Sequence, residues 1–395
     1  MTRLVPVRCA VLRGGTSRAI FFLENDVPLE RAAREPFLLD VFGSPDVRQI
    51  NGLGGATSQT SKAAFIGPPT RIDADLDYTF AQVAVAEPVV DWGGNCGNIS
   101  SAVGPFAIDQ GLVRAVEPLT TVRIHNTNTG KLIIASVPVE GGRAKVEGDY
   151  AIPGVPGCGA RIDLDFRDPA GSVSGKLLPT GRPVDMVELA DGRRLEASVV
   201  DAANPVVFLR ATDLGLTGAE SPAEIERATA ATAVLEEVRG VVAEWLGLVD
   251  DRRLATRRSP GLPKVGFVAA PGTYVTSDGA TVEAAASDLL ARLMSMQTAH
   301  RSYMVTGAIA TAAASSVPGT IVHEVARPST SRDRPDVLRI AHPYGVMDVV
   351  STADPAGPTG EPLIRGVTVG RTARHILDGQ VWVRHRLLEA QPAAQ

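Results

Sequence analysis

The chain is built mainly from short apolar runs with the two-residue period of a β-strand. Residues 5–12 alternate in this way, residues 20–23 form a second apolar run, and the glycine turn at 13–18 between them predicts a hairpin. Comparable runs predict further strands over 77–86, 122–125, 131–137, 145–147, 194–200, 206–209, 264–269, 337–341, 347–351, 363–371 and 380–385.

Helical spacing of apolar residues is confined to fewer segments. The longest predicted helix follows Ser221-Pro222, a cap with proline at the first helical position. Abundant glycine (39) and proline (28) with only 5% aromatic residues favour many short strands and turns over a helical bundle. Helices are predicted over 29–42, 99–108, 223–246 and 288–296, and from Thr306 to a stop at Pro318-Gly319.

The length of 395 residues predicts about two domains. A stretch rich in proline and glycine, 153–182, predicts the crossing between them, so we expect domains at 1–185 and 186–395, with the last strand able to pair with the N-terminal half. Residues 96–105 and 306–313 also resemble each other: a small polar residue, a glycine, then a helix of small residues. A pseudo-two-fold axis would bring two helix N-termini to one cleft, whereas shared composition alone would also explain the likeness.

Charge and composition exclude several classes of protein. A net charge of −5 gives no reason to expect nucleic acid or an anionic membrane as partner, and no apolar run has membrane-spanning length. The N-terminus lacks the features of a secretory peptide, and three cysteines make a disulfide framework improbable, so we expect a cytoplasmic protein. Six scattered histidines, His342 and His375 among them, lack metal-ligand spacing, and neither a metal nor a cofactor is expected.

The most informative segment is 93–101, Gly-Gly-Asn-Cys-Gly-Asn-Ile-Ser-Ser, centred on Cys96. Glycine lets backbone amides approach a ligand, and a helix N-terminus favours an anion and lowers the pKa of a thiol. This pattern predicts a carboxylate bound beside a thiol that moves a proton. The alternative is a buried structural cysteine at a tight turn.

Lys62 follows a polar loop of glycine, serine and threonine at 51–61, whose amides and hydroxyls could hold carboxylates. A lysine acts as a base only when burial or neighbouring cations lower its pKa. Proton transfer, charge pairing with a ligand and a solvated surface position are the three readings of Lys62. The loop is not a phosphate-binding P-loop, because Ser61 precedes the lysine and Ala63 follows it.

Other residues around these two are candidates for binding carboxylates. Backbone amides at the starts of the two small-residue helices are expected to hold them, as helix N-termini commonly do. Hydroxyl and amide side chains could add contacts, although Thr16 and Ser17 could equally serve only to form their turn. The predicted binding residues are Thr16, Ser17, Ser58, Asn95, Gly97, Asn98, Thr306, Gly307 and Ala308.

Six segments, in this order along the chain, resemble the 2-methylaconitate isomerase (PrpF-type) family, which shares the diaminopimelate-epimerase fold: 13–17, 54–62, 95–106, 125–131, 201–205 and 305–308. The resemblance implies an α+β protein of two similar domains, each a mixed, barrel-like sheet around a central helix, related by a pseudo-two-fold axis. It implies cofactor-independent proton transfer, by double-bond shift or cis–trans isomerisation, on a small unsaturated di- or tricarboxylate such as 2-methylaconitate, aconitate or oxalomesaconate. Lys62 and Cys96 match the family's two candidate proton-transfer residues.

One departure bears on the mechanism. Thr306 stands where racemases and epimerases of this fold carry a second cysteine, which disfavours a two-thiol mechanism and leaves Lys62 to complete the chemistry. An amino- or hydroxy-acid epimerase or racemase is the first alternative, a carboxylate-binding protein without catalysis the second, and a cysteine hydrolase a distant third. A homodimer is the generic expectation for a soluble enzyme.

Overall fold

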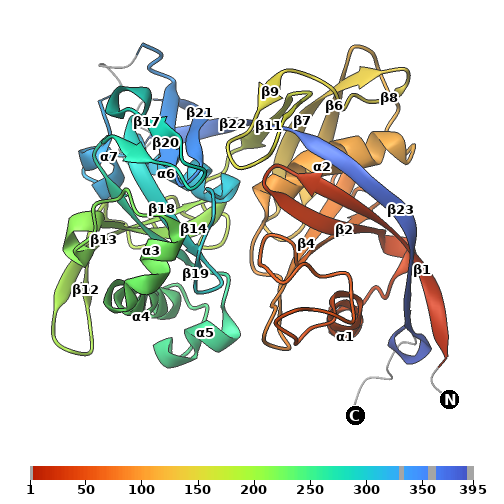
Figure 1. Ribbon diagram of the computed structural model, residues 1–395, viewed down its shortest axis with the longest axis horizontal. Helices are drawn as coiled ribbons and strands as arrows, with labels where there is room; N and C mark the ends of the chain where they lie inside the picture. The colour runs from red at the N-terminus through yellow and green to blue at the C-terminus, as the bar shows by residue number, and fades with distance from the viewer. Residues whose placement is uncertain (1–2, 329–332, 355–361, 389–395) are drawn as a thin grey trace.

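The computed structural model describes residues 3–328, 333–354 and 362–388. Two lobes lie side by side in Figure 1, one formed by the first half of the chain and the other by the second half. In each lobe a central helix, α2 (Gly97–Asp109) or α6 (Val305–Ser315), packs against the strands of a curved sheet. The exception to this division is the last strand, which lies in the first lobe.

The first lobe begins with the predicted hairpin. Gly14 pairs with Ser17 across its turn, and Gly15 takes a positive φ of 52°. After helix α1 (Arg31–Phe42), β3 runs parallel to β2, as a crossover connection allows. The strands of this half are β1 (Leu4–Gly14), β2 (Ser17–Leu23), β3 (Lys62–Gly67), β4 (Leu76–Val83), β5 (Val90–Asp91), β6 (Leu119–Asn126), β7 (Lys131–Glu140), β8 (Arg143–Ala144), β9 (Tyr150–Ala151), β10 (Cys158–Gly159) and β11 (Ile162–Arg167).

Helix α2 (Gly97–Asp109) forms the centre of this lobe. Its residues from Gly97 to Ile108 are all buried, and it contacts β1, β2, β6, β7, β11 and the last strand, β23 (Ala373–Arg384). Small residues allow this enclosure: a Cβ on Gly104 would lie 2.7 Å from Val137 Cγ2. A helix that is apolar on every face is buried in this way because no side is left for water.

The second lobe repeats the same order of elements. Helices connect the parallel strands β14 and β15, and α6 (Val305–Ser315) is buried at the centre of the lobe. The crossover helices are α3 (Pro222–Arg227), α4 (Thr229–Trp245) and α5 (Ala255–Arg258), and α7 (Ile321–Val325) follows α6. The strands are β12 (Asp185–Glu188), β13 (Arg194–Ala202), β14 (Asn204–Arg210), β15 (Lys264–Ala269), β16 (Tyr274–Val275), β17 (Thr281–Val282), β18 (Leu289–Ser295), β19 (Thr298–Ala299), β20 (Val337–His342), β21 (Gly345–Asp354), β22 (Leu363–Arg371) and β23 (Ala373–Arg384).

Three expectations about elements are corrected. The helix predicted over 288–296 is the strand β18, which pairs with β15 and β20 and is buried along its whole length. The helix predicted over 223–246 is interrupted at Ala228, where ψ is 63°. Residues 145–147 are not a strand; the short strand there is β8, which ends at Ala144.

Two strand pairings join the lobes. β11 of the first half pairs antiparallel with β22 of the second, and β23 pairs antiparallel with β1 along its length, from Leu4 opposite Arg384 to Gly14 opposite Ala373. Arg384 also forms an ion pair with Asp40 of α1. The C-terminal end of the described chain is thus part of the first lobe.

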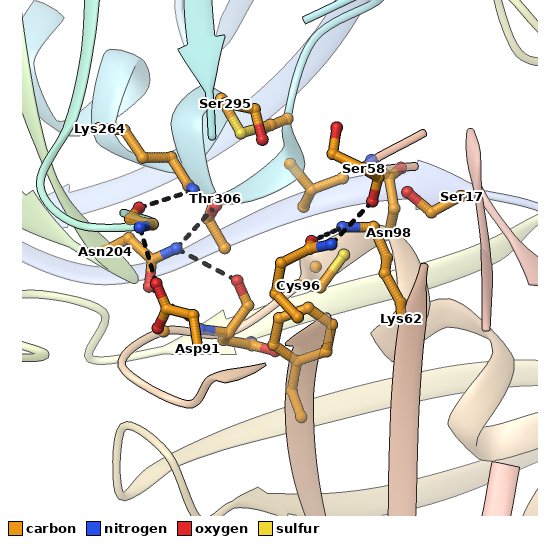
Figure 2. Close-up of a pocket in the computed structure, with 18 of the residues that line it drawn as sticks. Ser17, Ser58, Lys62, Asp91, Cys96, Asn98, Asn204, Lys264, Ser295 and Thr306 are labelled. Carbon is orange, nitrogen blue, oxygen red and sulfur yellow. Dashed lines mark hydrogen bonds between the residues drawn. The ribbon is translucent and has the colours of Figure 1, made fainter. Parts of the chain in front are cut away.

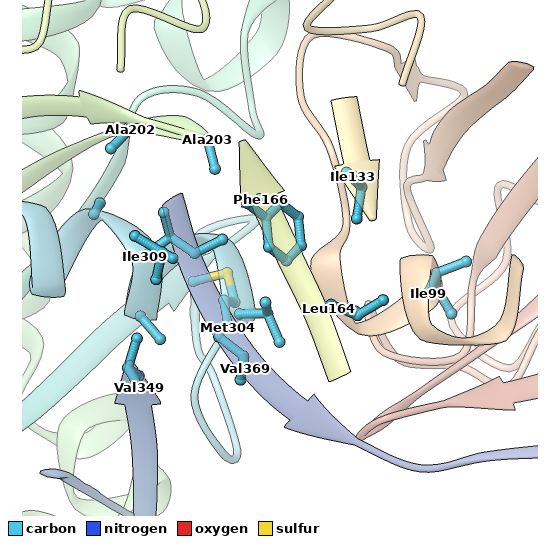
Figure 3. Close-up of a cluster of buried hydrophobic side chains, with 14 of the residues drawn as sticks. Ile99, Ile133, Leu164, Phe166, Ala202, Ala203, Met304, Ile309, Val349 and Val369 are labelled. Carbon is cyan, nitrogen blue, oxygen red and sulfur yellow. The ribbon is translucent and has the colours of Figure 1, made fainter. Parts of the chain in front are cut away.

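One hydrophobic core runs through both lobes. It contains Ile99 of α2, Phe166 of β11 and Met304, Ile309 and Val369 of the second half (Figure 3). Because these side chains form one cluster, the lobes are packed together rather than only linked. Among the described residues, none of the helices has both the length and the apolar character needed to cross a bilayer.

Replacing Phe106 with alanine should destabilise the protein. Phe106 of α2 is 3% exposed, and its ring centroid lies 5.2 Å from that of Phe21. The cavity left in this core should lower the free energy of unfolding by about 3–5 kcal/mol. Denaturant unfolding measures this, with Ile376→Ala on exposed β23 as the control, expected to change stability by no more than about 0.5 kcal/mol. Equal losses in both variants would contradict the assignment of α2 to the core.

Candidate active site

A cleft lined by both halves of the chain holds most of the predicted functional residues. It encloses about 580 Å³, its open mouth included. Lys62 and Cys96 line it together with the predicted binding residues Ser17, Ser58, Asn95, Gly97, Asn98 and Thr306 (Figure 2). Residues far apart in the sequence therefore meet in one concavity.

Three predicted binding residues lie outside this lining. The Thr16 hydroxyl accepts a hydrogen bond of 3.0 Å from Ser302 Oγ, which ties the first hairpin to the second half. Gly307 packs against Leu293, whose Cδ1 would lie 2.2 Å from a Cβ at that glycine. The amide of Ala308 donates to Met304 O at 2.8 Å within α6, so it is not free to bind a carboxylate.

Lys62 is the first residue of β3 and is only 7% exposed. Its ammonium group donates a hydrogen bond to Gln82 Oε1 of the neighbouring strand β4 and lies 5.3 Å from the centre of the Phe80 ring. No ion pair to Lys62 is formed by any residue that the structure describes. Burial lowers the pKa of Lys62 because an unpaired charge is poorly solvated there, while the neighbouring Cys96 acts in the opposite direction.

Gln82 holds this lysine in place. Its amide nitrogen donates to Ser58 O at 3.1 Å and to Ser61 O at 2.9 Å, so its oxygen is turned toward Lys62. The arrangement also fixes the polar loop that precedes β3. A glutamine in this role leaves the lysine without a counter-ion, which a glutamate would have supplied.

The N-termini of α2 and α6 meet at the cleft, as the pseudo-symmetric arrangement predicted. Cys96 is the N-cap residue of α2, and a Cβ on Gly97 would lie 2.5 Å from Val305 Cγ1 at the start of α6. The first backbone bond of α2 runs from the Ser100 amide to Cys96 O, so the amides of Gly97 and Asn98 have no partner within the helix. Two sets of such amides give the cleft a positive potential suited to carboxylates.

Asn204, at the start of β14, clamps the two helix starts together. Its side-chain oxygen accepts from the Asn95 amide at 3.2 Å, and its nitrogen donates to Asn95 O and to Thr306 Oγ1, each at 3.1 Å. Gly94 leaves room for this clamp, because a Cβ there would lie 2.9 Å from the Asn204 oxygen. The loop that carries Cys96 is therefore fixed by a residue of the other half.

The side chain of Asn98 has a defined orientation. Its oxygen accepts from Arg371 Nε at 3.2 Å and from the Thr16 amide at 3.4 Å. Arg371 is buried, and burial lowers its pKa to about 10, so it remains charged at neutral pH. With the oxygen occupied, the NH2 group of Asn98 is the part left to donate to a ligand in the cleft.

The sequence analysis missed six polar residues of the cleft: Gln82, Asp91, Asn204, Lys264, Ser295 and His300. Asp91 accepts from the amides of Gly93 and Gly261, each at 2.7 Å, and so links the two lobes. Burial, with a contribution from nearby Lys62, lowers the pKa of Lys264 to about 8. The signal that could have found Lys264 is its place at the start of the strand predicted over 264–269, since Lys62 likewise comes directly before the apolar residues 63–66.

His300 enters the cleft as a neutral ring. Burial lowers its pKa to about 3. The Ser302 amide donates to Nδ1 at 3.2 Å, so the neutral ring carries its proton on Nε2. His300 thus offers a hydrogen-bond donor without adding charge. No cluster of histidine, cysteine and carboxylate side chains suited to a metal ion occurs among the described residues.

Comparisons with known proteins agree with this geometry. A family model described as PrpF protein matches residues 4–384. The 3-methylitaconate isomerase of Eubacterium barkeri is 46% identical over 384 residues, which are 97% of this chain and 98% of the relative. The 2-methyl-aconitate isomerase of Shewanella oneidensis is 38% identical over 392 residues, 96% of this chain and 97% of the relative.

Solved structures give the same result. The crystal structure of methylitaconate-delta-isomerase has a TM-score of 0.78 at 45% identity and covers 99% of each chain. A probable proline racemase from Agrobacterium radiobacter K84, at 15% identity, has a TM-score of 0.52 over 95% of this chain and 92% of that one, and shows the fold alone.

The fold is the α+β fold that this isomerase and the probable proline racemase share, as the resemblance implied. The chain belongs to the PrpF family, whose members named above are isomerases. Fold class and family are therefore confirmed, whereas the domain boundary between residues 185 and 186 stays a prediction.

The neutral burial of His300 should make stability depend on pH. The unfolded chain takes up a proton at this residue near its ordinary value of 6.5, but the folded protein only near 3. Between these values the unfolded state binds more protons, so the free energy of unfolding falls as pH decreases, by up to about 1.4 kcal/mol per pH unit for one such group. Denaturant unfolding from about pH 6.5 to 4 should show a smaller slope for His300→Asn, which keeps an acceptor for Ser302 but cannot titrate.

The slope should shrink rather than vanish, because burial also lowers the pKa of His342, which remains in the variant. His323→Asn, at an exposed position on α7, is the control and should keep the wild-type slope. Parallel stability curves for wild type and His300→Asn would contradict the neutral burial of this ring.

Proposed function

We propose that this protein is a cofactor-independent isomerase that moves a proton on a small unsaturated di- or tricarboxylate, with Lys62 as base and Cys96 as its partner acid. The observation that carries the proposal is a buried lysine without a counter-ion, in one cleft with a thiol at a helix N-terminus. The family supports it, since the matched relatives are named as isomerases of methylitaconate and methylaconitate. A cytoplasmic location and a homodimer remain predictions.

Lys62 has the environment that a base requires. A base must be neutral before it takes a proton, and burial lowers the pKa of this lysine and so favours the neutral amine. Gln82 accepts a hydrogen bond from the nitrogen in either protonation state, which leaves the nitrogen lone pair of the amine for the substrate. The proton removed is one on the carbon γ to a carboxylate, where a conjugated double bond makes it acidic.

The helix N-termini suit the intermediate. Loss of the proton gives a dienolate whose negative charge spreads onto carboxylate oxygens, and preorganised donors lower the barrier by stabilising that charge. The free amides of Gly97 and Asn98 and the NH2 group of Asn98 are such donors. They are fixed by Arg371 and Asn204, so little reorganisation is needed when the charge develops.

Cys96 can complete the double-bond shift. Its thiol would return a proton at the carbon α to the carboxylate, and the proton held by Lys62 would then restore the thiol, directly or through solvent. If Lys62 alone removes and returns the proton, rotation about the transient single bond of the dienolate gives cis–trans isomerisation instead. Thr306 occupies the other helix start, where a racemase of this fold would need its second thiol.

Lys62→Ala should abolish exchange of substrate hydrogen with solvent deuterium while the protein stays folded. General acid–base catalysis contributes about 10²–10⁴-fold, so turnover should fall by at least about 10²-fold. Proton NMR in heavy water, over a panel of methylitaconate, methylaconitate, aconitate and oxalomesaconate, follows both exchange and isomerisation. Exchange at the wild-type rate in Lys62→Ala would remove the lysine from the mechanism.

The same base should shape the pH–rate profile. Turnover should rise with pH as Lys62 loses its proton, and the midpoint of the rise should lie below the ordinary lysine value of 10.5 because burial lowers the pKa of Lys62. A midpoint at or above that value, measured from kcat/KM against pH, would contradict its role as a buried base.

Cys96→Ser tests the second group separately. A serine keeps the size of the side chain but is a much weaker acid than a thiol, so a double-bond shift that needs Cys96 should slow by about 10²-fold or more. Isomerisation and deuterium incorporation are measured together. Near-normal turnover would assign Cys96 to the lining of the cleft and leave Lys62 to act alone.

A further inference from the structure

The cleft contains a second lysine that the proposed proton transfer does not use. Lys264 lines it from the second half of the chain, where its ammonium group donates to Gly261 O at 3.2 Å. In Figure 2, Lys264 and Lys62 lie on opposite sides of Cys96, Lys264 on the side of Thr306 and Asn204. Both lysines interact electrostatically with Cys96 and with each other, so they belong to one site.

The strand pairings show that the two lysines occupy equivalent positions. Lys62 is the first residue of β3, opposite Ala19 in the parallel strand β2; Lys264 is the first residue of β15, opposite Val206 in the parallel strand β14. Each parallel pair is linked through helices, α1 in one half and α3 and α4 in the other. The repeat continues beyond them, because β4 runs parallel to β6 as β18 runs parallel to β20.

The two equivalent lysines have different surroundings. Lys62 is almost completely buried and donates a hydrogen bond to the side-chain amide of Gln82. Lys264 is less buried, donates to a backbone carbonyl and lies near Asp91, whose charge favours the protonated lysine. Its pKa of about 8 keeps it mostly protonated at neutral pH. The two equivalent lysines therefore differ in their partners: a neutral side-chain amide holds Lys62, whereas Lys264 has a carboxylate nearby that favours its charged form.

Among the described residues none forms a direct ion pair with Lys264, and the charge of Asp91 acts on it without such a contact. A charge inside a cleft is normally paired. The start of α6 and the Thr306 hydroxyl lie on the same side, so that side of the cleft offers a charge, a dipole and a hydroxyl donor to one anionic group. On the other side of Cys96, the start of α2 and the side chain of Asn98 offer a second position at which an anionic group can bind.

We propose that Lys264 binds a second carboxylate of the substrate, the one remote from the carbon that loses its proton. The inference rests on the proposed function for the identity of the reacting end. It commits the site to a substrate with at least two carboxylates, held at both helix starts with the reacting carbon between them, near Lys62 and Cys96. A substrate with a single carboxylate would leave Lys264 without a partner.

The test separates binding from turnover. Tricarballylate is a saturated tricarboxylate that cannot undergo the double-bond shift, and calorimetric titration measures its affinity for wild type, Lys264→Gln and Lys264→Arg. Loss of a charged hydrogen bond should weaken binding by Lys264→Gln by about 10- to 100-fold, with partial recovery in Lys264→Arg. For whichever unsaturated polycarboxylate the wild type converts, KM should rise by a similar factor and kcat should change by less than about 3-fold.

Two controls isolate the charge of Lys264. Lys145→Gln removes a lysine that pairs with Glu140 at 3.3 Å on the surface of the first lobe, and it should leave affinity and KM unchanged. Lys62→Gln should lower kcat far more than it lowers tricarballylate affinity. Thermal unfolding of every variant shows whether it is folded under the conditions of titration.

The outcomes distinguish this inference from the proposed function. If Lys264→Gln weakens tricarballylate binding but the wild type isomerises no polycarboxylate, the role of Lys264 stands and the proposed function fails. If the wild type turns over and Lys264→Gln leaves both affinity and KM unchanged, the role of Lys264 fails. A fall in kcat of about 10³-fold at unchanged KM would make Lys264 a proton-transfer group and would also overturn the inference.

Discussion

The close approach of two helix starts, at Gly97 and Val305, determines where everything else in the cleft can lie. Each helix is enclosed by strands of its own lobe, so bringing the two N-termini together fixes the two lobes relative to each other. The strands that carry Lys62 and Lys264 then open toward the same space, and Asn204 locks the contact with hydrogen bonds to both helix starts. The packing of the backbone thus brings the charges of the two lysines, the dipoles of the two helices and the thiol of Cys96 into one cleft.

The sequence was sufficient for those parts of the site that are local. The loop before Lys62 and the segment around Cys96 each carry their glycines and hydroxyls within about ten residues, so a single motif reveals them. Lys264 is different, because its equivalence to Lys62 lies in strand pairing and not in the neighbouring residues. Gln82 was missed for the same reason, since its partners Ser58 and Ser61 come from another segment of the chain, and His300 was missed because only the fold brings it to the cleft.

The same distinction explains the errors in the elements. β18 reads Leu-Leu-Ala-Arg-Leu-Met-Ser, a run of good helix formers, yet it lies between β15 and β20 and is buried on both faces. A short run that is apolar throughout shows neither the two-residue period of a strand nor the 3.6-residue period of a helix. Its pairing with the neighbouring strands therefore determines its conformation. The hairpin of β1 and β2 was predictable because the glycine turn and the alternation of apolar and polar residues both lie within one short segment of the sequence.

The pairing of β23 with β1 has a consequence for how the molecule is made. β1 emerges from the ribosome before β23, so this edge of the first lobe stays open until β23 has been synthesised. An exposed strand edge during that interval can pair with another nascent chain. The first lobe therefore cannot complete its folding before β23 has been made. Expressing the two halves of the chain as separate proteins would leave β1 in one product and β23 in the other, each without its partner strand.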